Sequence, residues 1–340
     1  MTRTETAAPG IATQTAPLLD VRDLKVTFNS RDGAADAICG IDLSVGAGEV
    51  LGIVGESGSG KSVTMMALMQ LLPASADITG SARFRGQELV GATSSTMRQL
   101  RGARIGMIFQ DPLTAFNPVL TVGAQIVEAL RLHEKDLSKK AAWERAVELL
   151  AEVSIPQPDR RAAQYPHEFS GGMRQRAMIA MAIANRPDLL IADEPTTALD
   201  VTVQAQIMDL LNRLREERNI GLILITHDLG VVAGAADRIA VMYSGRIVEQ
   251  GSVDEVFYNP RHPYTRGLLA ALPKIDGEAG PLVAIEGTPP SLRNRPAGCA
   301  FRPRCSVSVE RCSTSVPALL SLNGVETACH RSEELQRISA

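Results

Sequence analysis

Short runs of apolar residues alternate with longer segments of helical periodicity between residues 18 and 251. The runs at Val50–Val54 (VLGIV), 189–192 (LLIA) and 222–226 (LILIT) are almost continuously apolar, which is typical of strands covered by helices on both faces. Helical spacing predicts helices over residues 62–72, ended by Pro73, and over residues 202–218. Residues 239–251 (IAVMYSGRIVEQG) predict a β-hairpin with Ser-Gly at its turn. The pattern therefore predicts an α/β fold.

The pattern changes after Gly251, where proline becomes frequent and strand signals fade. We expect three parts: a disordered polar tail at residues 1–17, an α/β domain at residues 18–251, and an extension at residues 252–340. Four of the five cysteines lie in this extension, namely Cys299, Cys305, Cys312 and Cys329. The fifth, Cys39, lies near a predicted strand and is expected to be a small core hydrophobe.

The composition argues against a nucleic-acid-binding, secreted or membrane-spanning protein. The chain has 35 basic and 38 acidic residues and a net charge of −3, so no field of one sign favours nucleic acid. The first residues lack the apolar core of a signal peptide, and no apolar run reaches the about 18 residues that span a bilayer. We expect a soluble chain made in the cytosol, where clustered cysteines are more often metal ligands than disulfides.

Residues 55–62 (GESGSGKS) follow the strand predicted at Val50–Val54 directly and open the next predicted helix. The spacing fits G-x-x-x-x-G-K-[ST], in which glycines let backbone N–H groups surround phosphate oxygens at a helix N-terminus. Lys61 would reach the β- and γ-phosphates, and Ser62 would ligate Mg²⁺. The alternative is a Gly/Ser-rich turn with an incidental lysine, and the strand–loop–helix context argues against it.

A second apolar strand ends in two adjacent carboxylates, Asp193 and Glu194, in LLIADEP. Two acids at the end of a buried strand are costly unless a cation or a reaction uses them. We expect Asp193 to hold Mg²⁺ and Glu194 to polarise an attacking water; the alternative is an N-cap pair for the following helix. FSGGM, at residues 169–173, lies ahead of this strand and by itself indicates only a turn before a helix.

Taken together, these motifs resemble those of the nucleotide-binding subunits of ABC transporters, and they occur in that family's order. GESGSGKS resembles the Walker A loop, Gln110 the Q-loop, FSGGM the LSGGQ signature, LLIADEP the Walker B strand, residues 198–200 the D-loop and His227 the switch histidine. The resemblance implies an ABC-type P-loop domain with a mixed sheet and a helical subdomain at about residues 112–180. The small Cys-rich extension would follow it.

The resemblance also implies a role for each motif residue. It implies catalytic roles for Glu194, His227 and Lys61, and Mg²⁺ ligation through Ser62, Gln110 and Asp193. The implied ATP-binding residues are Phe28, Gly55, Ser57, Gly58, Ser59, Gly60, Lys61, Ser62, Thr64 and Gln110, with Phe28 stacking on adenine. For His227, the alternative is a structural histidine that follows a core strand.

The resemblance further implies that ATP lies between two subunits that face each other head to tail. Ser170, Gly171 and Gly172 of the signature would bind the nucleotide of the partner subunit. The signature departs from LSGGQ at Phe169 and Met173, which favours a heterodimer with a second homologous ATPase subunit.

YPHEFSGGMRQR, DPLTAFNP, NPRHPYTRGLLAALP and GTPPSL resemble the branch of the family that serves oligopeptide and dipeptide importers, whose relatives carry nickel or glutathione. This resemblance implies two transmembrane permease subunits, an extracytoplasmic substrate-binding protein and a peripheral position on the cytoplasmic face of the cell membrane. DPLTAFNP would dock the permease through exposed Leu113 and Phe116, with local packing as the alternative.

The cysteines follow the spacing C-x₅-C-x₆-C-x₁₆-C, which lacks the close C-x₂₋₄-C pairs usual in structural zinc sites. Four thiolates suit either tetrahedral zinc or an iron–sulfur cluster. The resemblance to the importer branch implies a [4Fe–4S] cluster. Zinc, free thiols and substitution by His330 are the alternatives.

Two other functions remain open from the sequence. A soluble ABC ATPase that acts in translation or DNA repair would share the nucleotide motifs. A regulatory binder that does not hydrolyse ATP would be expected to lack Glu194 or His227, and both are present. The cargo, whether dipeptide, oligopeptide, nickel or glutathione, is not encoded in these motifs.

Overall fold

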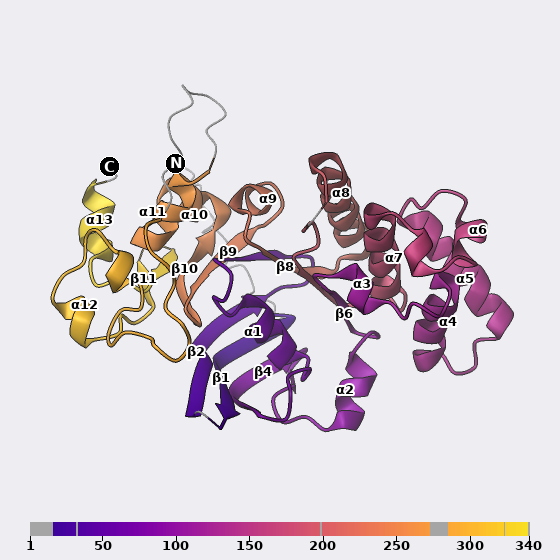
Figure 1. The fold of residues 1–340 in the computed structure, drawn as a ribbon, viewed down its shortest axis with the longest axis horizontal. Helices are drawn as coiled ribbons and strands as arrows, with labels where there is room; N and C mark the ends of the chain where they lie inside the picture. Colours follow the sequence, from indigo (N-terminus) through magenta and orange to yellow (C-terminus); the bar gives the residue numbers. More distant parts are fainter. Residues whose placement is uncertain (1–15, 32, 198, 273–284, 323, 339–340) are drawn as a thin grey trace, which may run out of the picture.

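The computed structural model describes residues 16–31, 33–197, 199–272, 285–322 and 324–338, and Figure 1 shows their arrangement. Residues 1–15, which make up most of the predicted polar tail, lie outside these ranges.

A mixed sheet forms the centre of the described residues. Its strand order is β11-β12-β10-β9-β3-β8-β7-β6. The strands are β3 (Val50–Val54), β6 (Ile105–Ile108), β7 (Leu189–Asp193), β8 (Gly221–Thr226), β9 (Arg238–Tyr243), β10 (Arg246–Ser252), β11 (Leu320–Leu322) and β12 (Val325–Thr327). From β6 to β9 the neighbours pair in parallel, and β10, β11 and β12 pair antiparallel. The predicted mixed sheet is confirmed.

The continuous apolar runs have a structural cause, because both faces of the central strands are covered. In β3, Val50 and Val54 contribute to one hydrophobic core, whereas Leu51 and Ile53 contribute to another. The second core lies against an antiparallel sheet with the order β2-β1-β4-β5. Its strands are β1 (Leu19–Ser30), β2 (Gly33–Val45), β4 (Ala76–Phe84) and β5 (Gln87–Glu88).

Helices cover the sheet and form a separate lobe, seen at the right of Figure 1. The lobe contains α3 (Pro112–Ala115), α4 (Val122–His133), α5 (Lys139–Glu152), α6 (Pro158–Ala162), a 3₁₀ turn at Pro166–Glu168 and α7 (Gly171–Ile183). It corresponds to the helical subdomain expected at about residues 112–180. The other helices of the α/β part are α1 (Lys61–Leu68), α2 (Ser94–Leu100), α8 (Val201–Arg218) and α9 (Leu229–Ala233).

Two local predictions are confirmed and one is wrong in its end point. α8 matches the predicted helix, and β9 and β10 form the predicted hairpin. Its turn residues, Ser244 and Gly245, have φ values of 49° and 75°, as a type I′ turn requires. The first helix, however, ends at Leu68 and not before Pro73, because Gln70 takes a left-handed conformation with φ of 48°.

The extension contains α10 (Val253–Tyr258), α11 (Pro263–Ala270), a 3₁₀ turn at Arg302–Arg304, α12 (Arg311–Thr314), β11, β12 and α13 (Ser332–Ile338). It gathers beside β10 at the left of Figure 1. β12 pairs with β10, at Glu249↔Thr327 and Gln250↔Glu326. The expectation that strands end near residue 252 was therefore incomplete, since two short strands of the extension continue the central sheet.

Glu249, on β10, anchors the start of α11. Its side chain is fully buried and accepts the backbone N–H groups of Arg261 at 2.6 Å and His262 at 3.1 Å. Burial raises the pKa of this carboxyl, and these hydrogen bonds oppose the rise. A buried acid is tolerated here because its oxygens satisfy donors that the helix start leaves unpaired.

Among the described residues, no helix combines the length and the hydropathy that crossing a bilayer requires.

We expect Glu249→Ala to lower the free energy of unfolding by about 2–5 kcal/mol, because two buried N–H groups lose their acceptor. Urea unfolding followed by circular dichroism measures the loss. Glu333→Ala, at an exposed glutamate of α13, is the matched control and should change stability by less than about 0.5 kcal/mol. Equal stability of the two variants would contradict an anchoring role.

Candidate functional site

The loop between β3 and α1 takes a path that only glycine allows at two points. Gly55 and Gly60 have φ values of 156° and 109°. A Cβ atom at Gly55 would lie 2.2 Å from the Met242 carbonyl oxygen, and one at Gly60 would lie 2.6 Å from Ile38 Cδ1. The loop can therefore turn tightly from the sheet into the first turn of α1.

The loop borders a cavity of about 160 Å³ at the carboxyl ends of β3 and β7. Seven consecutive loop and helix residues line it, from Ser57 to Val63, together with Gln110 and Glu194. Ser57, Gly58, Ser59, Gly60, Lys61 and Ser62 from the predicted phosphate site are thus brought together. Thr64 is buried and donates its hydroxyl to the Gly60 carbonyl at 3.0 Å, so it braces the loop from behind.

Lys61 is only 5% exposed, and its Nζ donates to the carbonyl oxygens of Gly55 at 2.7 Å and Glu56 at 3.1 Å. Burial lowers the pKa of this lysine, while the negative charges of Glu194, Asp193 and Glu56 oppose that change. The Lys61 side chain therefore lies near several carboxylates. Their negative charge, and not contact with water, stabilises its protonated form.

Ser62 and Asp193 form an oxygen pair at the end of β7. The Ser62 hydroxyl donates to Asp193 Oδ1 at 3.0 Å, and Asp193 is 3% exposed. Burial raises the pKa of Asp193, and the hydrogen bond from Ser62 opposes the rise. Hydroxyl and carboxylate oxygens are the donors that Mg²⁺ prefers, so the donor chemistry of this pair fits that ion.

Glu194 is held by three side chains. Its Oε2 accepts from Gln110 Nε2 at 3.1 Å and from the Thr197 hydroxyl at 2.9 Å, and it lies 3.4 Å from His227 Nδ1. Its backbone is left-handed, with φ of 48°, and its N–H donates to the Ile225 carbonyl. Sequence reasoning missed Thr197, whose place in ADEPTT was the available signal.

The geometry gives no support to the structural alternatives for these residues. The N-cap of α8 is Asp200, which accepts from Val203 N at 2.9 Å, so Asp193 and Glu194 do not cap that helix. The His227 side chain is 62% exposed, so the core does not enclose it, and its catalytic role stays a prediction. Glu194 lines the cavity, while Asp193 and His227 contact residues that line it, Ser62 and Glu194.

The signature residues lie elsewhere on the chain. Ser170 is the N-cap of α7 and accepts from Met173 N at 3.3 Å, and Ser170 and Gly171 are exposed. Neither they nor Gly172 line the phosphate cavity of their own chain. Of the two residues that depart from LSGGQ, Phe169 is buried and Met173 packs partly against the core. In the D-loop, Ala198 lies outside the described residues.

Phe28 lies on β1, half-buried, opposite Ala35 on β2 and Ala76 on β4. It packs against the core below the antiparallel sheet and does not line the phosphate cavity. Its stacking on adenine stays a prediction.

Two predictions about apolar residues need correction. Leu113 is 59% exposed, as expected, but Phe116 is 4% exposed. α3 has only four residues, and Phe116, just after it, turns inward to the core that includes Val122 and Ile126. Cys39 is half-buried and its Sγ accepts from the Arg295 guanidinium, so it is not a core residue.

The four cysteines of the extension border one small cavity, together with His262, Phe301 and His330. All four are free thiols, and burial raises the pKa of Cys299, Cys305 and Cys329, the last to about 11. His330 Nε2 lies 2.9 Å from the Ser315 carbonyl oxygen. In the part of the chain that the structure describes, no group of three or more His, Cys, Asp or Glu side chains is placed to hold a metal ion. The predicted [4Fe–4S] site thus gains no support from ligand geometry.

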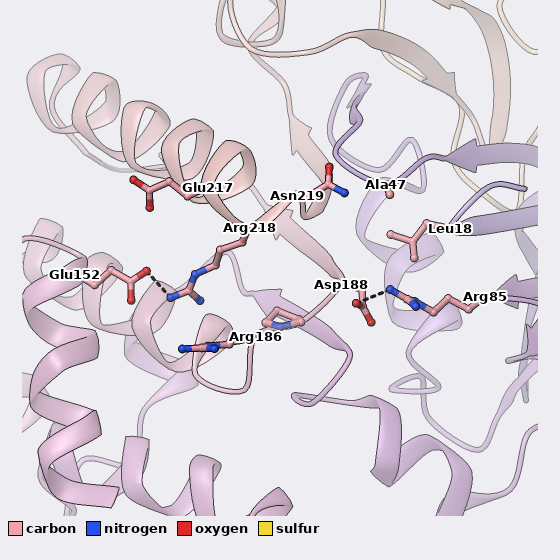
Figure 2. Close-up of a pocket in the computed structure, with 10 residues that line it drawn as sticks. Leu18, Ala47, Arg85, Glu152, Arg186, Asp188, Glu217, Arg218 and Asn219 are labelled. Carbon is pink, nitrogen blue, oxygen red and sulfur yellow. Dashed lines mark hydrogen bonds and ion pairs between the residues drawn. The ribbon is translucent and has the colours of Figure 1, made fainter. Parts of the chain in front are cut away.

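A second cavity, of about 740 Å³, is lined by residues at the amino ends of β7 and β8, and Figure 2 shows its lining. Its lining includes Asp188 and Asn219, which precede β7 and β8. Four of its charged residues form two ion pairs within the chain, Arg218 with Glu152 and Arg85 with Asp188. In open α/β sheets ligands bind at the carboxyl ends of strands, so the smaller cavity beside Lys61 is the candidate site.

Comparison with known families gives two matches. The family described as ABC transporter matches residues 38–197. The family described as oligopeptide/dipeptide transporter, C-terminal region, matches residues 248–312. The first match covers most of the α/β part, and the second includes the first three of the clustered cysteines.

Individual relatives are similar over nearly the whole chain. The oligopeptide transport ATP-binding protein OppD of Escherichia coli is 52% identical over 331 residues, covering 97% of this chain and 98% of the relative. A putative peptide import ATP-binding protein of Brucella melitensis is 51% identical over 321 residues, covering 90% and 94%. A solved dimeric ATP-binding cassette bound to ADP and Pi is 27% identical with a TM-score of 0.63, covering 69% of this chain and 98% of its own.

We expect Glu194→Gln to lower kcat for ATP hydrolysis about 10²–10⁴-fold, because the amide cannot accept a proton. Nucleotide affinity should stay within about threefold, since the carboxylate is not needed to bind phosphate. A phosphate-release assay and a fluorescent-nucleotide titration measure the two effects. Glu217→Gln, at an exposed glutamate of α8, is the control. An unchanged rate of ATP hydrolysis in Glu194→Gln would contradict a catalytic role for Glu194.

Proposed function

The chain belongs to the ATP-binding subunits of ABC transporters, in the oligopeptide transport branch, and from that premise we propose how its residues work. It is the ATP-hydrolysing subunit that powers oligopeptide import through an ABC transporter. The observation that carries this function is the convergence of Lys61, Ser62 and Glu194 on one cavity, with Asp193 hydrogen-bonded to Ser62.

ATP binds with its phosphates against the loop at residues 55–60 and Lys61. Ser62, Gln110 and Asp193 offer the oxygen atoms that hold Mg²⁺, which neutralises charge on the phosphate oxygens when bound. Support comes from the Ser62–Asp193 hydrogen bond and from the orientation of Gln110, whose Nε2 points to Glu194 and leaves its oxygen available.

Glu194 orients a water for in-line attack on the γ-phosphorus and accepts its proton, while the bond to the β–γ bridging oxygen breaks and ADP leaves. Gln110 and Thr197 fix the carboxylate, because both donate to the same oxygen. His227 would hold the γ-phosphate and the water in line. Its exposure of 62% leaves the imidazole accessible to a nucleotide.

The signature acts in trans. Ser170, Gly171 and Gly172 offer a hydroxyl and backbone N–H groups at the N-terminus of α7, a 13-residue helix, and this arrangement suits a γ-phosphate held by a partner subunit. The dimeric state of the related cassette supports the pairing. We propose a heterodimer with a second homologous ATPase subunit, because Met173 replaces the glutamine of LSGGQ.

Two transmembrane permease subunits and an extracytoplasmic substrate-binding protein complete the importer. The chain then acts as a peripheral subunit on the cytoplasmic face of the membrane. Exposed Leu113 lies three residues after Gln110. Phe109, the residue before Gln110, lines a mostly apolar cavity of about 290 Å³ together with Leu71 and Leu132. This surface suits an apolar helix of the permease.

The four thiols of the extension ligate a [4Fe–4S] cluster in this proposal. A tetrahedral zinc site, with Zn–S distances of about 2.3 Å, needs sulfurs within about 3.8 Å of one another, whereas a four-iron cluster accepts a wider set. The observation behind this part of the proposal is that the four free thiols border one cavity. The cluster would supply folding free energy to a segment poor in apolar residues.

Anaerobically purified protein should show a broad absorbance band at the blue end of the visible spectrum and contain about four iron and four sulfide per chain. Cys305→Ser should lose the band, because one ligand is missing, while Cys39→Ser should keep it. A colourless protein that contains zinc, or neither metal, would refute the cluster.

Lys61→Ala should lower ATP hydrolysis and peptide uptake by the assembled complex at least about 10²-fold, because the phosphate charge loses its cation. Uptake is measured in proteoliposomes that contain both permease subunits and the second ATPase, with dipeptides, oligopeptides, nickel and glutathione as competitors.

Lys140→Ala, at a lysine of α5 whose side chain is 89% exposed, is the control and should leave uptake unchanged. Full uptake without Lys61, or failure of the permease subunits to co-purify, would favour a soluble ABC ATPase instead.

A further inference from the structure

Arg304 lies between two of the clustered cysteines, in GCAFRPRC, yet its guanidinium reaches the phosphate-binding loop. Its side chain is 4% exposed and forms a two-point pair with Glu56 of that loop: Nη1 donates to Oε2 at 2.6 Å and Nη2 to Oε1 at 2.9 Å. The remaining donors point to the carbonyl oxygens of Ile285 and Glu286 and to the Tyr243 hydroxyl. All five N–H groups of the arginine thus have an acceptor.

Glu56 is also held through its backbone by the same extension. Its N–H donates to the hydroxyl of Tyr264, on α11, at 2.9 Å. Its carbonyl oxygen accepts from Lys61 Nζ at 3.1 Å. The extension therefore holds Glu56 at both its side chain and its N–H group. The carbonyl of Glu56 in turn contacts Lys61, the lysine proposed to bind phosphate.

An aromatic cluster keeps these two contacts rigid. The ring of Tyr243, at the end of β9, lies 4.6 Å from that of Tyr264 and 5.3 Å from that of Phe301, centroid to centroid. Tyr264 and Phe301 are 5.4 Å apart. Phe301 starts the turn that carries Arg304, so the cluster fixes both contacts to the same place on the central sheet.

The contacts between Glu56 and the extension affect how the loop binds a phosphate ligand, because Glu56 carries a negative charge. A carboxylate in a phosphate-binding loop repels a polyanion, and in the free chain it acts on Lys61 as a nearby negative charge. The paired guanidinium cancels that charge and turns the carboxylate toward the extension. Because the pair is almost fully excluded from water on the arginine side, salt screens it less than a surface pair.

We propose that Arg304 and Tyr264 are positioning residues for the reaction at the phosphate site. They hold Glu56 so that the loop is arranged for ATP before it binds and carries no uncompensated negative charge. The inference rests on the proposed function, since it names residues that prepare the same site. Through Arg304 and Tyr264, the extension would thus directly affect the affinity for ATP.

Arg304→Gln should raise the Kd and KM for ATP about tenfold at constant Mg²⁺, and kcat should stay within about threefold, because no group that touches the reacting atoms is changed. Glu56→Gln placed in the Arg304→Gln background should restore the Kd to within about threefold of the unmodified protein, since the repelling charge is gone. Arg311→Gln, which removes an exposed arginine of the same extension, should change nothing.

Tyr264→Phe removes only the hydroxyl and should raise the Kd about threefold. It serves as the second variant should Arg304→Gln fail to fold, which urea unfolding of each protein reveals. Affinity unchanged in folded Arg304→Gln and in Tyr264→Phe would overturn the inference.

The double variant also separates a local charge effect from damage to the cysteine segment. If Arg304→Gln acted by disturbing the cysteines, Glu56→Gln would not rescue it, and that result would overturn the inference as well. Failure of the unmodified protein and of Arg311→Gln to bind ATP would instead overturn the proposed function on which the inference depends.

Discussion

A lysine that is nearly excluded from water, at the carboxyl end of a parallel sheet, is the constraint on which the site depends. Burial of Lys61 disfavours its charge, and three acids, Asp193, Glu194 and Glu56, counteract that cost. The acids in turn need hydrogen-bond donors. Ser62 serves Asp193, Gln110 and Thr197 serve Glu194, and Arg304 serves Glu56. Many of the contacts around the site therefore serve to stabilise these buried charges.

The features of the site that depend on residues close together in the sequence could be predicted from the sequence. Strand β3, its loop and α1 form one continuous segment, so the glycine spacing and the apolar run fix their conformation together. The same holds for Asp193 and Glu194 at the end of β7, and for the turn at Ser244 and Gly245. In each case the deciding interactions lie within a few residues, and periodicity and turn preferences reflect them directly.

The remaining parts depend on contacts between distant residues, which leave no local pattern. Glu56 and Arg304 are 248 positions apart, and Cys39 and Arg295 are 256 apart. The strand pattern alone predicts Cys39 in the core, whereas its side chain is half-buried and its sulfur accepts a hydrogen bond from Arg295 of the extension. The proline-bounded loop alone predicts an exposed Phe116, whereas this side chain is buried in the core that includes Val122 of α4 and Ile179 of α7.

The pairing of β12 with β10 also determines what would happen to a shortened chain. β10 pairs with β9 on one side, and on its other side Glu249 and Gln250 pair with β12. A polypeptide that stopped at residue 252 would present β10 as a bare edge, and bare edges recruit strands from other molecules. Proteolytic loss of the extension would therefore yield a self-associating fragment and not a smaller working enzyme.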